Sequence, residues 1–362
     1  MTEKNDSILV FEYFTASGEK DKSIISEAEA MLFSLLDDLT DFEVNLVINE
    51  SYKNVIEDSK NLNTIFIGEN IISWLENNSF KYKKAIFIAG ENDNNLVNIT
   101  KILEDNGVKI YTSSSKACFK ASDKYETYSE LLNYVPQPQS FKLKIDSKGD
   151  WIKSIEGLFK KWQDEYSHLQ LKMIIKPLTG VDCENIVVIN QYSDISHDLE
   201  KIYPKNSKII VQKYIDGVDV SVSLISDGKK AKALSLNKQL IEINKSDGVY
   251  LGGTLPYESK FKEKIFDIAT KAVESIGGLK GFVGVDLKIS NDENDVNSVY
   301  LLEINSRFTT PYVGLKKIIN INIGKTIIDL VEGNTNIDDL KISLDGEVEF
   351  IKSEESLKIR RI

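Results

Sequence analysis

The sequence has few of the residues and segments that mark several large classes of protein. Its two cysteines, Cys118 and Cys183, form no CxxC pair, so the pattern suggests neither a disulfide framework nor a zinc site. No apolar run approaches the roughly 20 residues needed to cross a bilayer. The first seven residues are polar and acidic, unlike a secretory signal. We therefore expect a cytoplasmic protein with no membrane partner.

Positive charge is scarce, and almost all of it comes from lysine. The formal net charge is −11, and no basic stripe of the kind that binds nucleic acid is present. The only arginines are Arg307, Arg360 and Arg361, so Arg307 alone lies inside the body of the chain. A protein with this charge can bind an anionic nucleotide only where local cations and metal ions overcome the overall field.

The 362 residues suffice for two or three packed units. Over the first ~110 residues, short apolar runs alternate with helical patterns, which indicates a βαβ unit with a parallel sheet. The expected strands span 8–14, 43–48, 64–67, 85–89 and 108–111, and the expected helices span 23–39, behind a serine cap, and 95–106.

The rest of the chain changes character twice. A predicted helix over 114–133 ends at two prolines, and a compact α+β piece follows to about residue 204, with a helix over 151–165 and strands over 171–176 and 185–189. After residue 207 the pattern favours long strands of antiparallel character. These are expected over 208–214, 218–226, 230–236, 281–290 and 298–304, with helices over 260–276 and 324–332 and one edge strand in the charged tail.

Hard oxygen ligands are concentrated in two of the predicted strands. Asp286 stands among apolar neighbours, where a carboxylate needs a partner that offsets its desolvation. Glu303 and Asn305 are two residues apart, so they project from one face of their strand. Two carboxylates and an amide oxygen suit Mg²⁺ or Mn²⁺, with phosphate oxygens and water completing the coordination. Three polar residues on a solvent face remain the alternative for this pattern.

Arg307 lies two residues beyond Asn305, and we expect it on the same face. Its planar fork binds phosphate or carboxylate through two hydrogen bonds, which lysine cannot do. We therefore predict that Arg307 holds a phosphoryl group in a transition state.

Lysines and a sharp turn form a second group. Lys176 ends an apolar strand and is followed by a loop containing Gly180, whose backbone N–H groups could cradle a phosphate. Lys124 precedes a helix. The segment 212–217 ends a strand in a turn that could bind an adenine edge, and Asp219 could take ribose or substrate hydroxyls. The nucleotide-binding candidates are Lys124, Lys176, Gly180, Gln212, Lys213, Tyr214, Ile215 and Asp219. Each alone also fits an ordinary strand, turn or snorkelling lysine.

Taken in order, these residues resemble the ATP-grasp superfamily. The resemblance spans about 113–332 and implies ATP held between two α+β subdomains, with two Mg²⁺ or Mn²⁺ ions on Asp286, Glu303 and Asn305. It implies catalytic roles for Arg307 and Lys176. It divides the chain into a preATP-grasp βαβ domain (1–112), an N-terminal ATP-grasp subdomain with the phosphate loop (113–207), a C-terminal subdomain with the metal site (208–340) and a charged tail (341–362).

Further segments resemble one group within that superfamily, the archaeal tyramine–L-glutamate ligases of methanofuran biosynthesis. These segments span 11–18, 235–239, 250–256 and 305–312. Two positions depart from the usual ATP-grasp pattern: Gln212 stands where glutamate is common, and Ser306 where proline is. The resemblance implies amide formation through an acyl-phosphate, using ATP, L-glutamate and tyramine, with the loop 178–184 as a lid.

Two alternatives remain open from the sequence: an ATP-grasp ligase for a different acid and amine, and a non-catalytic nucleotide-binding protein. Candidates for the substrate pocket are Tyr250, Thr309, Thr310 and Tyr312. The oligomeric state is not fixed, a homodimer included.

Overall fold

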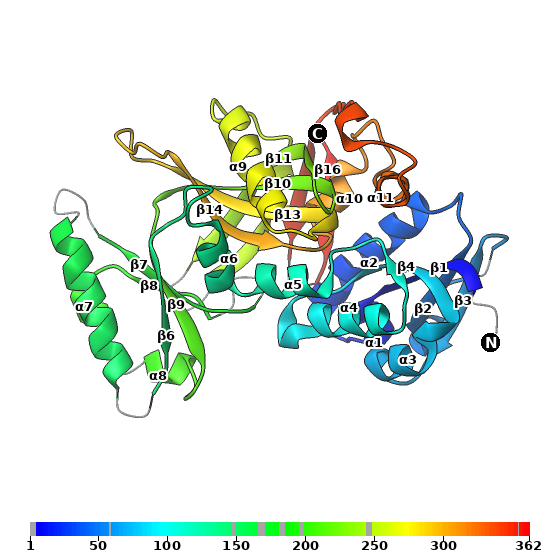
Figure 1. The fold of residues 1–362 in the computed structure, drawn as a ribbon, viewed down its shortest axis with the longest axis horizontal. Coiled ribbons are helices and arrows are strands. Elements are labelled where there is room, and N and C mark those ends of the chain that lie inside the picture. Colours follow the sequence, from blue (N-terminus) through cyan, green and yellow to red (C-terminus); the bar gives the residue numbers. More distant parts are fainter. Residues whose placement is uncertain are drawn as a thin grey trace.

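The computed structural model describes residues 5–57, 59–146, 149–165, 171–180, 185–195, 199–243, 248–353 and 355–362. It contains three sheets (Figure 1). Residues 181–184 of the expected lid, which include Cys183, lie outside the described residues. Among the described helices, none is long and apolar enough to span a membrane.

The N-terminal unit is built on a five-stranded parallel sheet in the order β3-β2-β1-β4-β5. Leu9 and Phe11 pack on one face, and Ile8 and Val10 on the other, as expected for a parallel strand buried on both sides. Its strands are β1 (Asn5–Glu12), β2 (Val44–Asn49), β3 (Leu62–Ile67), β4 (Tyr82–Ile88) and β5 (Lys109–Ile110).

The helices of this unit cover both faces of the sheet and confirm the predicted βαβ layout. They are α1 (Tyr13–Ser17), α2 (Lys22–Asp38), α3 (Ile71–Asn78) and α4 (Asn95–Asp105). The cap of α2 is Asp21, whose carboxylate accepts from the N–H groups of Ser23 and Ile24, so the predicted serine cap is wrong. Helix α3 was not predicted from the sequence.

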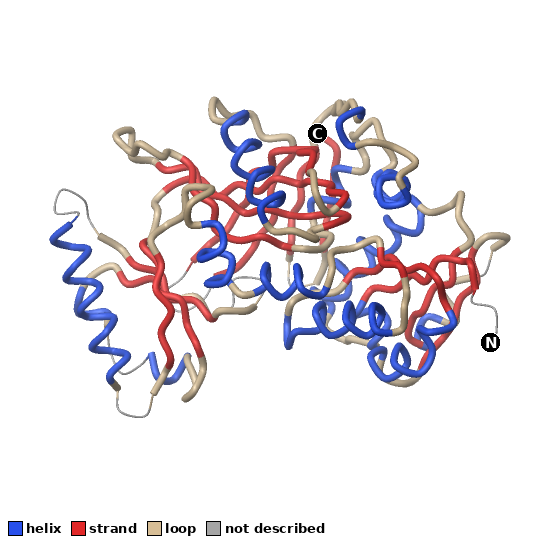
Figure 2. The backbone as a smooth tube through the Cα atoms, viewed as in Figure 1, coloured by secondary structure: helices blue, strands red, loops and turns tan. Residues whose placement is uncertain are grey.

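A four-stranded antiparallel sheet in the order β6-β9-β7-β8 forms the second unit. Its elements are β6 (Ser140–Lys144), α7 (Asp150–Glu165), β7 (Met173–Pro177), β8 (Val187–Ile189), α8 (Leu199–Ile202) and β9 (Lys208–Lys213). Two helices precede it in the chain, α5 (Ser115–Ser122) and α6 (Lys124–Leu131). The helix expected over 114–133 breaks at Asp123, which caps α6. Figure 2 shows α7 at one end of the molecule, against this small sheet.

The third unit is a seven-stranded antiparallel sheet in the order β14-β13-β10-β11-β12-β15-β16. Its elements are β10 (Gly217–Asp227), β11 (Ala231–Ile243), β12 (Gly248–Leu255), α9 (Lys262–Ser275), β13 (Lys280–Ser290), β14 (Val299–Asn305), α10 (Pro311–Leu315), α11 (Ile323–Glu332), β15 (Val348–Lys352) and β16 (Leu357–Arg361). Short 3₁₀ turns span Glu50–Tyr52, Ser79–Lys81, Asn92–Asn94, Tyr192–Asp194 and Ile337–Asp339.

The sheets divide the chain differently from the sequence pattern at two points. Strand β9 hydrogen-bonds to β6 and β7, so the small sheet extends to Lys213. The tail supplies two strands, β15 and β16, and they extend the large sheet through β12. Strand pairing depends on contacts between distant segments, which local periodicity does not record.

Two packed layers hold the large sheet in place. One face packs against α5, α6 and α9 through residues such as Val222, Val285 and Ala269. The other faces the N-terminal unit through Phe282, Phe308 and Tyr312, which share a core with α2. Phe308 stacks on Phe282 with ring centroids 5.3 Å apart, so the segment that follows β14 is fixed to the sheet.

Candidate active site

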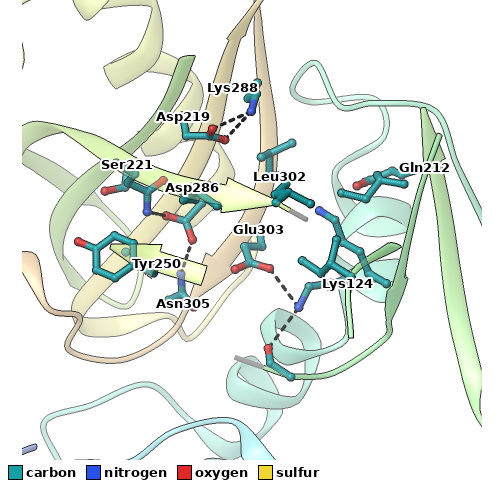
Figure 3. Close-up of a pocket in the computed structure, with 18 of the residues that line it drawn as sticks. Lys124, Gln212, Asp219, Ser221, Tyr250, Asp286, Lys288, Leu302, Glu303 and Asn305 are labelled. Atoms are coloured by element: carbon teal, nitrogen blue, oxygen red, sulfur yellow. Dashed lines mark hydrogen bonds and ion pairs between the residues drawn. The ribbon is translucent and has the colours of Figure 1, made fainter. Parts of the chain in front are cut away.

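One pocket lies between the small sheet and the large sheet, and all twelve predicted site residues line it. Figure 3 shows Lys124, Gln212, Asp219, Asp286, Glu303 and Asn305 among them. The predicted residues in its wall are Lys124, Lys176, Gly180, Gln212, Lys213, Tyr214, Ile215, Asp219, Asp286, Glu303, Asn305 and Arg307. Apolar side chains from both sheets, including Ile174, Ile186 and Leu302, line it as well. A cleft with a mixed apolar and charged wall suits a nucleotide, whose base is flat and apolar and whose phosphates are charged.

Asp286 and Glu303 are cross-strand neighbours on β13 and β14. The ladder shifts register between Asp286 and Leu287, and Leu302 is the unpaired residue on β14. This bulge brings Leu302 into the same pocket as Glu303, although adjacent strand residues ordinarily face opposite ways. The bulge therefore places an apolar side chain beside two carboxylates.

Amide side chains hold the Asp286 carboxylate from both sides. Gln239 Nε2 donates to Oδ1 at 2.9 Å, and Asn305 Nδ2 donates to Oδ2 at 2.8 Å. Because Asn305 uses its nitrogen here, its amide oxygen is the atom available as a metal ligand. Burial, reinforced by the charge of Glu303, raises the pKa of Asp286 to about 7. Burial and a neighbouring carboxylate thus both oppose ionisation of Asp286.

Glu303 has a different electrostatic environment. Burial opposes its ionisation, but the ammonium groups of Lys124 and Lys176 outweigh burial and lower the pKa of Glu303. Lys124 Nζ lies 3.0 Å from Glu303 Oε2. These two lysines come from α6 and β7, so the small-sheet side of the pocket supplies cations to carboxylates on the large sheet.

The donor set fits a divalent cation that also binds phosphate. Among the described residues, no group of three or more His, Cys, Asp or Glu side chains converges, so Asp286 and Glu303 have no third carboxylate beside them, and the amide of Asn305 is the additional predicted oxygen donor. Mg²⁺ and Mn²⁺ accept such a sparse oxygen set when phosphate oxygens complete the octahedron. The raised pKa of Asp286 also fits, because a bound cation would compensate the paired carboxylates.

The loop after β7 is tied to the start of α6. The backbone N–H of Lys124 donates to the Leu178 carbonyl at 2.9 Å, and Lys124 Nζ donates to the Gly180 carbonyl at 3.3 Å. Gly180 has φ +146°, a conformation that side-chain-bearing residues rarely adopt. Lys176 is buried at the end of β7. The phosphate-binding candidates therefore form one connected group.

The predicted adenine segment begins with a side chain held inside the protein. Gln212 is buried, and its Nε2 donates to Ser140 Oγ at 2.9 Å. The Tyr214 N–H donates to the Lys172 carbonyl at 3.0 Å. Beyond the turn, both carboxylate oxygens of Asp219 accept from Lys288 Nζ at 2.7 Å. The predicted ribose ligand is therefore part of an ion pair.

Arg307 does not lie on the strand that its spacing suggested. Strand β14 ends at Asn305, so alternation along the strand does not orient Arg307. Its Nε donates to Glu91 Oε2 at 2.6 Å and its Nη1 to the Phe308 carbonyl at 3.1 Å. It still lines the pocket, and Glu91 of the N-terminal unit helps to hold it there.

The structure adds residues that the sequence analysis did not select, and it removes one. Gln239 and Lys288 contact predicted site residues, and Glu27 lines the pocket where the Thr310 hydroxyl donates to it. Lys288 could have been found, because it is two residues from Asp286 on one strand. Tyr312 is wrong as a pocket candidate: it is fully buried and its hydroxyl donates to Asp38 at 2.7 Å.

The fold and this pocket define a class of nucleotide-dependent enzyme. A family model described as the ATP-grasp domain matches residues 121–311, and the chain belongs to the ATP-grasp family. It is an ATP-dependent carboxylate–amine ligase.

A relative from Methanocaldococcus jannaschii, the tyramine–L-glutamate ligase, is 33% identical over 355 residues, covering 94% of this chain and 92% of the relative. Two solved structures share the fold. An ATP-grasp superfamily protein from Archaeoglobus fulgidus has a TM-score of 0.70 at 24% identity, covering 99% of this chain and 100% of that one. A biotin carboxylase–ATP complex from Campylobacter jejuni has a TM-score of 0.71 at 15% identity, and the match covers 96% of this chain and 75% of that one.

Proposed function

We propose that this ligase joins the γ-carboxylate of L-glutamate to tyramine, giving γ-glutamyltyramine, a step of methanofuran biosynthesis. The observation that carries the proposal is the 33% identity to a tyramine–L-glutamate ligase over 94% of this chain. The pocket supports it, because cations suited to phosphates and carboxylates suited to metal ions line it together. Tyr250, Ile241 and Ile243 also line the pocket and offer contact to an aromatic ring.

The residues of the pocket suit a two-step reaction. A carboxylate oxygen of the acid attacks the γ-phosphorus of ATP, and the bond to the β,γ-bridging oxygen breaks to give an acyl-phosphate and ADP. The amine then attacks the acyl carbon, phosphate leaves, and the amine loses a proton. Lys124 and Lys176 would neutralise the phosphates, and Arg307 would stabilise the transferring phosphoryl group.

Asp286, Glu303 and Asn305 would hold Mg²⁺ or Mn²⁺, two ions by the family resemblance. A bound cation would supply charge neutralisation at the β- and γ-phosphate oxygens. Gln239 and Asn305 orient the Asp286 carboxylate through the two hydrogen bonds already described. Apolar neighbours such as Leu302 would limit access of water to the acyl-phosphate.

A panel of acids and amines tests the proposal. ADP release is measured with L-glutamate and tyramine together, with each alone, and with D-glutamate, L-aspartate, phenethylamine and dopamine in place of one partner. We expect release that requires both L-glutamate and tyramine, and a product whose fragmentation in mass spectrometry shows the γ-linkage. The Asp286→Ala variant measures background ATP hydrolysis.

Stimulation by a different pair, with none by L-glutamate and tyramine, would overturn the named substrates and leave an ATP-grasp ligase for another acid and amine. An α-linked product would overturn only the assignment of the γ-carboxylate as the reacting group of L-glutamate.

A further inference from the structure

The arginine of the pocket is held by a residue from a separate unit of the protein. Glu91 lies just after β4, at the carboxyl edge of the N-terminal parallel sheet, and it is 216 residues from Arg307 in sequence. The Nε–Oε2 distance is 2.6 Å, and the side chains are 17% and 5% exposed for Arg307 and Glu91. A pair that is this short and this shielded is charge-assisted and little screened by solvent.

The loop that carries Glu91 has a fixed shape. The Glu91 carbonyl accepts from the Asn94 N–H at 3.1 Å, and the Gly90 carbonyl accepts from the Leu96 N–H at 3.1 Å. Asp93 and Asn94 both have positive φ, 52° and 59°, which few residue types other than Asn and Asp tolerate. Glu91 is therefore presented by a closed turn, which limits how far its carboxylate can shift.

The carboxylate of Glu91 has an incomplete set of contacts. Its Oε1 is buried and has no hydrogen-bond partner among the described residues, while Oε2 accepts from Arg307. A buried carboxylate oxygen without a hydrogen-bond partner is costly, so this arrangement lowers the stability of the folded protein. Such a penalty is common where a group is placed for function.

We infer that Glu91 is a positioning residue for Arg307, so that the N-terminal unit forms part of the phosphoryl-transfer site. This rests on the proposed role of Arg307. Beyond the end of β14, the arginine side chain has several rotatable bonds and loses rotamer entropy when it is held in one geometry. Glu91 on one side and the Phe308 carbonyl on the other fix the plane of the guanidinium at the pocket wall. A pre-oriented cation stabilises developing charge without reorganising during the reaction.

A purely structural tie between the two units is the competing explanation. The chain offers a matched control, because Glu332 of α11 also links the N-terminal and C-terminal units. Its carboxylate accepts from Lys109 Nζ at 2.7 Å and from the Tyr111 hydroxyl at 2.6 Å, and it does not line the pocket. Glu332→Gln therefore weakens a contact between the same units and leaves Arg307 untouched.

The experiment compares Glu91→Gln, Glu91→Asp and Glu332→Gln with the wild-type protein. The first readout is steady-state ADP release with acid and amine. We expect kcat of Glu91→Gln to fall about tenfold with KM for ATP within twofold, because the interaction matters most when charge develops. Glu91→Asp retains the charge and should recover part of the loss, and Glu332→Gln should keep wild-type kcat.

The second readout needs no acid or amine, so it does not depend on the proposed substrates. Calorimetry measures the Kd of Mg·ADP alone and of Mg·ADP with orthovanadate, a mimic of the transferring phosphoryl group. We expect Glu91→Gln to weaken the vanadate complex about tenfold and to leave Mg·ADP within twofold. Failure of the wild type to make an amide, with this vanadate effect present, would refute the proposed substrates and leave the inference standing.

A double-mutant cycle with Arg307→Ala covers the case in which the Glu91 variants are destabilised. If Glu91 acts through Arg307, adding Glu91→Gln to Arg307→Ala should cause no further loss of vanadate affinity. Wild-type kcat and vanadate affinity in Glu91→Gln would overturn the inference. Equal losses in Glu332→Gln, or a full additional loss in the double variant, would also overturn it in favour of a structural tie.

Discussion

Lys124 Nζ contacts both a carboxylate and a backbone carbonyl of the pocket: it lies 3.0 Å from Glu303 Oε2 and 3.3 Å from the Gly180 carbonyl oxygen. Lys124 is the first residue of α6, and its side chain contacts a candidate metal ligand on β14 and the loop after β7. The same lysine lowers the pKa of Glu303 and keeps this carboxylate ionised. One side chain therefore links the candidate phosphate loop to a candidate metal ligand.

Replacing this lysine should weaken nucleotide binding. In Lys124→Met, which keeps most of the side-chain volume and removes the charge, we expect KM for Mg·ATP to rise about tenfold. Initial rates over a range of ATP concentrations at saturating acid and amine measure this. Lys120→Met is the control, because Lys120 of the neighbouring helix α5 pairs with Glu130, and neither residue lines the pocket. An unchanged KM in Lys124→Met would contradict a phosphate-binding role.

Neutralising Asp286 should separate activity from stability. We expect Asp286→Asn to lower ADP release by about 100-fold or more, because a ligand for the cation is lost. Its pKa is raised to about 7 by burial and by Glu303, so the ionised carboxylate is destabilising above that pH. The variant should therefore be as stable as the wild type at pH 8, or more stable, by urea denaturation. Glu349→Gln, on β15 of the same sheet and paired with Arg360, should change neither property strongly. Wild-type turnover in Asp286→Asn would refute the metal-ligand role.

Glu12 should make stability depend on pH in an unusual direction. Burial raises the pKa of its carboxyl from 4.5 to about 7, although the Thr15 and Phe14 N–H groups oppose this. Between these two pH values the folded state binds more protons than the unfolded state. Its contribution to the free energy of unfolding therefore falls as pH rises, by roughly 1.4 kcal/mol per pH unit.

Glu12→Gln should remove this dependence. The test is urea denaturation at pH 5, 6, 7 and 8, and the difference between variant and wild type should favour the variant increasingly up to about pH 7. Glu19→Gln is the matched control, since Glu19 also accepts two backbone N–H groups but is exposed. Parallel stability curves for Glu12→Gln and wild type would contradict the prediction.

Gly217 should not tolerate a side chain. A Cβ added there would lie 1.9 Å from the Ile289 carbonyl oxygen, because β10 and β13 approach closely at this point. We expect Gly217→Ala to lower the free energy of unfolding by about 1–3 kcal/mol, since backbone must shift. Gly277→Ala is the control, because a Cβ there meets nothing within 4 Å. Equal denaturation midpoints for the two variants would show that the sheet relaxes without cost.

Local spacing was enough to select the candidate oxygen ligands. Glu303 and Asn305 are two apart on a strand, and Asp286 interrupts an apolar strand, so their chemistry is visible without tertiary structure. The βαβ pattern of the first unit was equally clear, because parallel strands are long apolar runs. Strands β6 and β12 were missed, because the alternation of β6 covers only five residues and β12 contains Gly248, Gly252 and Gly253, a residue type depleted in strands. Their pairing with β9 and β15 joins segments far apart in the chain.

The sequence by itself determined which residues are candidate metal and phosphate ligands and which arginine is internal. Only the tertiary structure decided how these groups are oriented. Glu91 holds Arg307, and Lys288 holds Asp219, through contacts between residues 216 and 69 positions apart. The periodicity of a sequence predicts which face of a helix or strand a side chain occupies. It does not predict which distant helix or strand packs against that face. Burial and charge pairing between units are therefore properties of the folded chain, and here they set the geometry of the site.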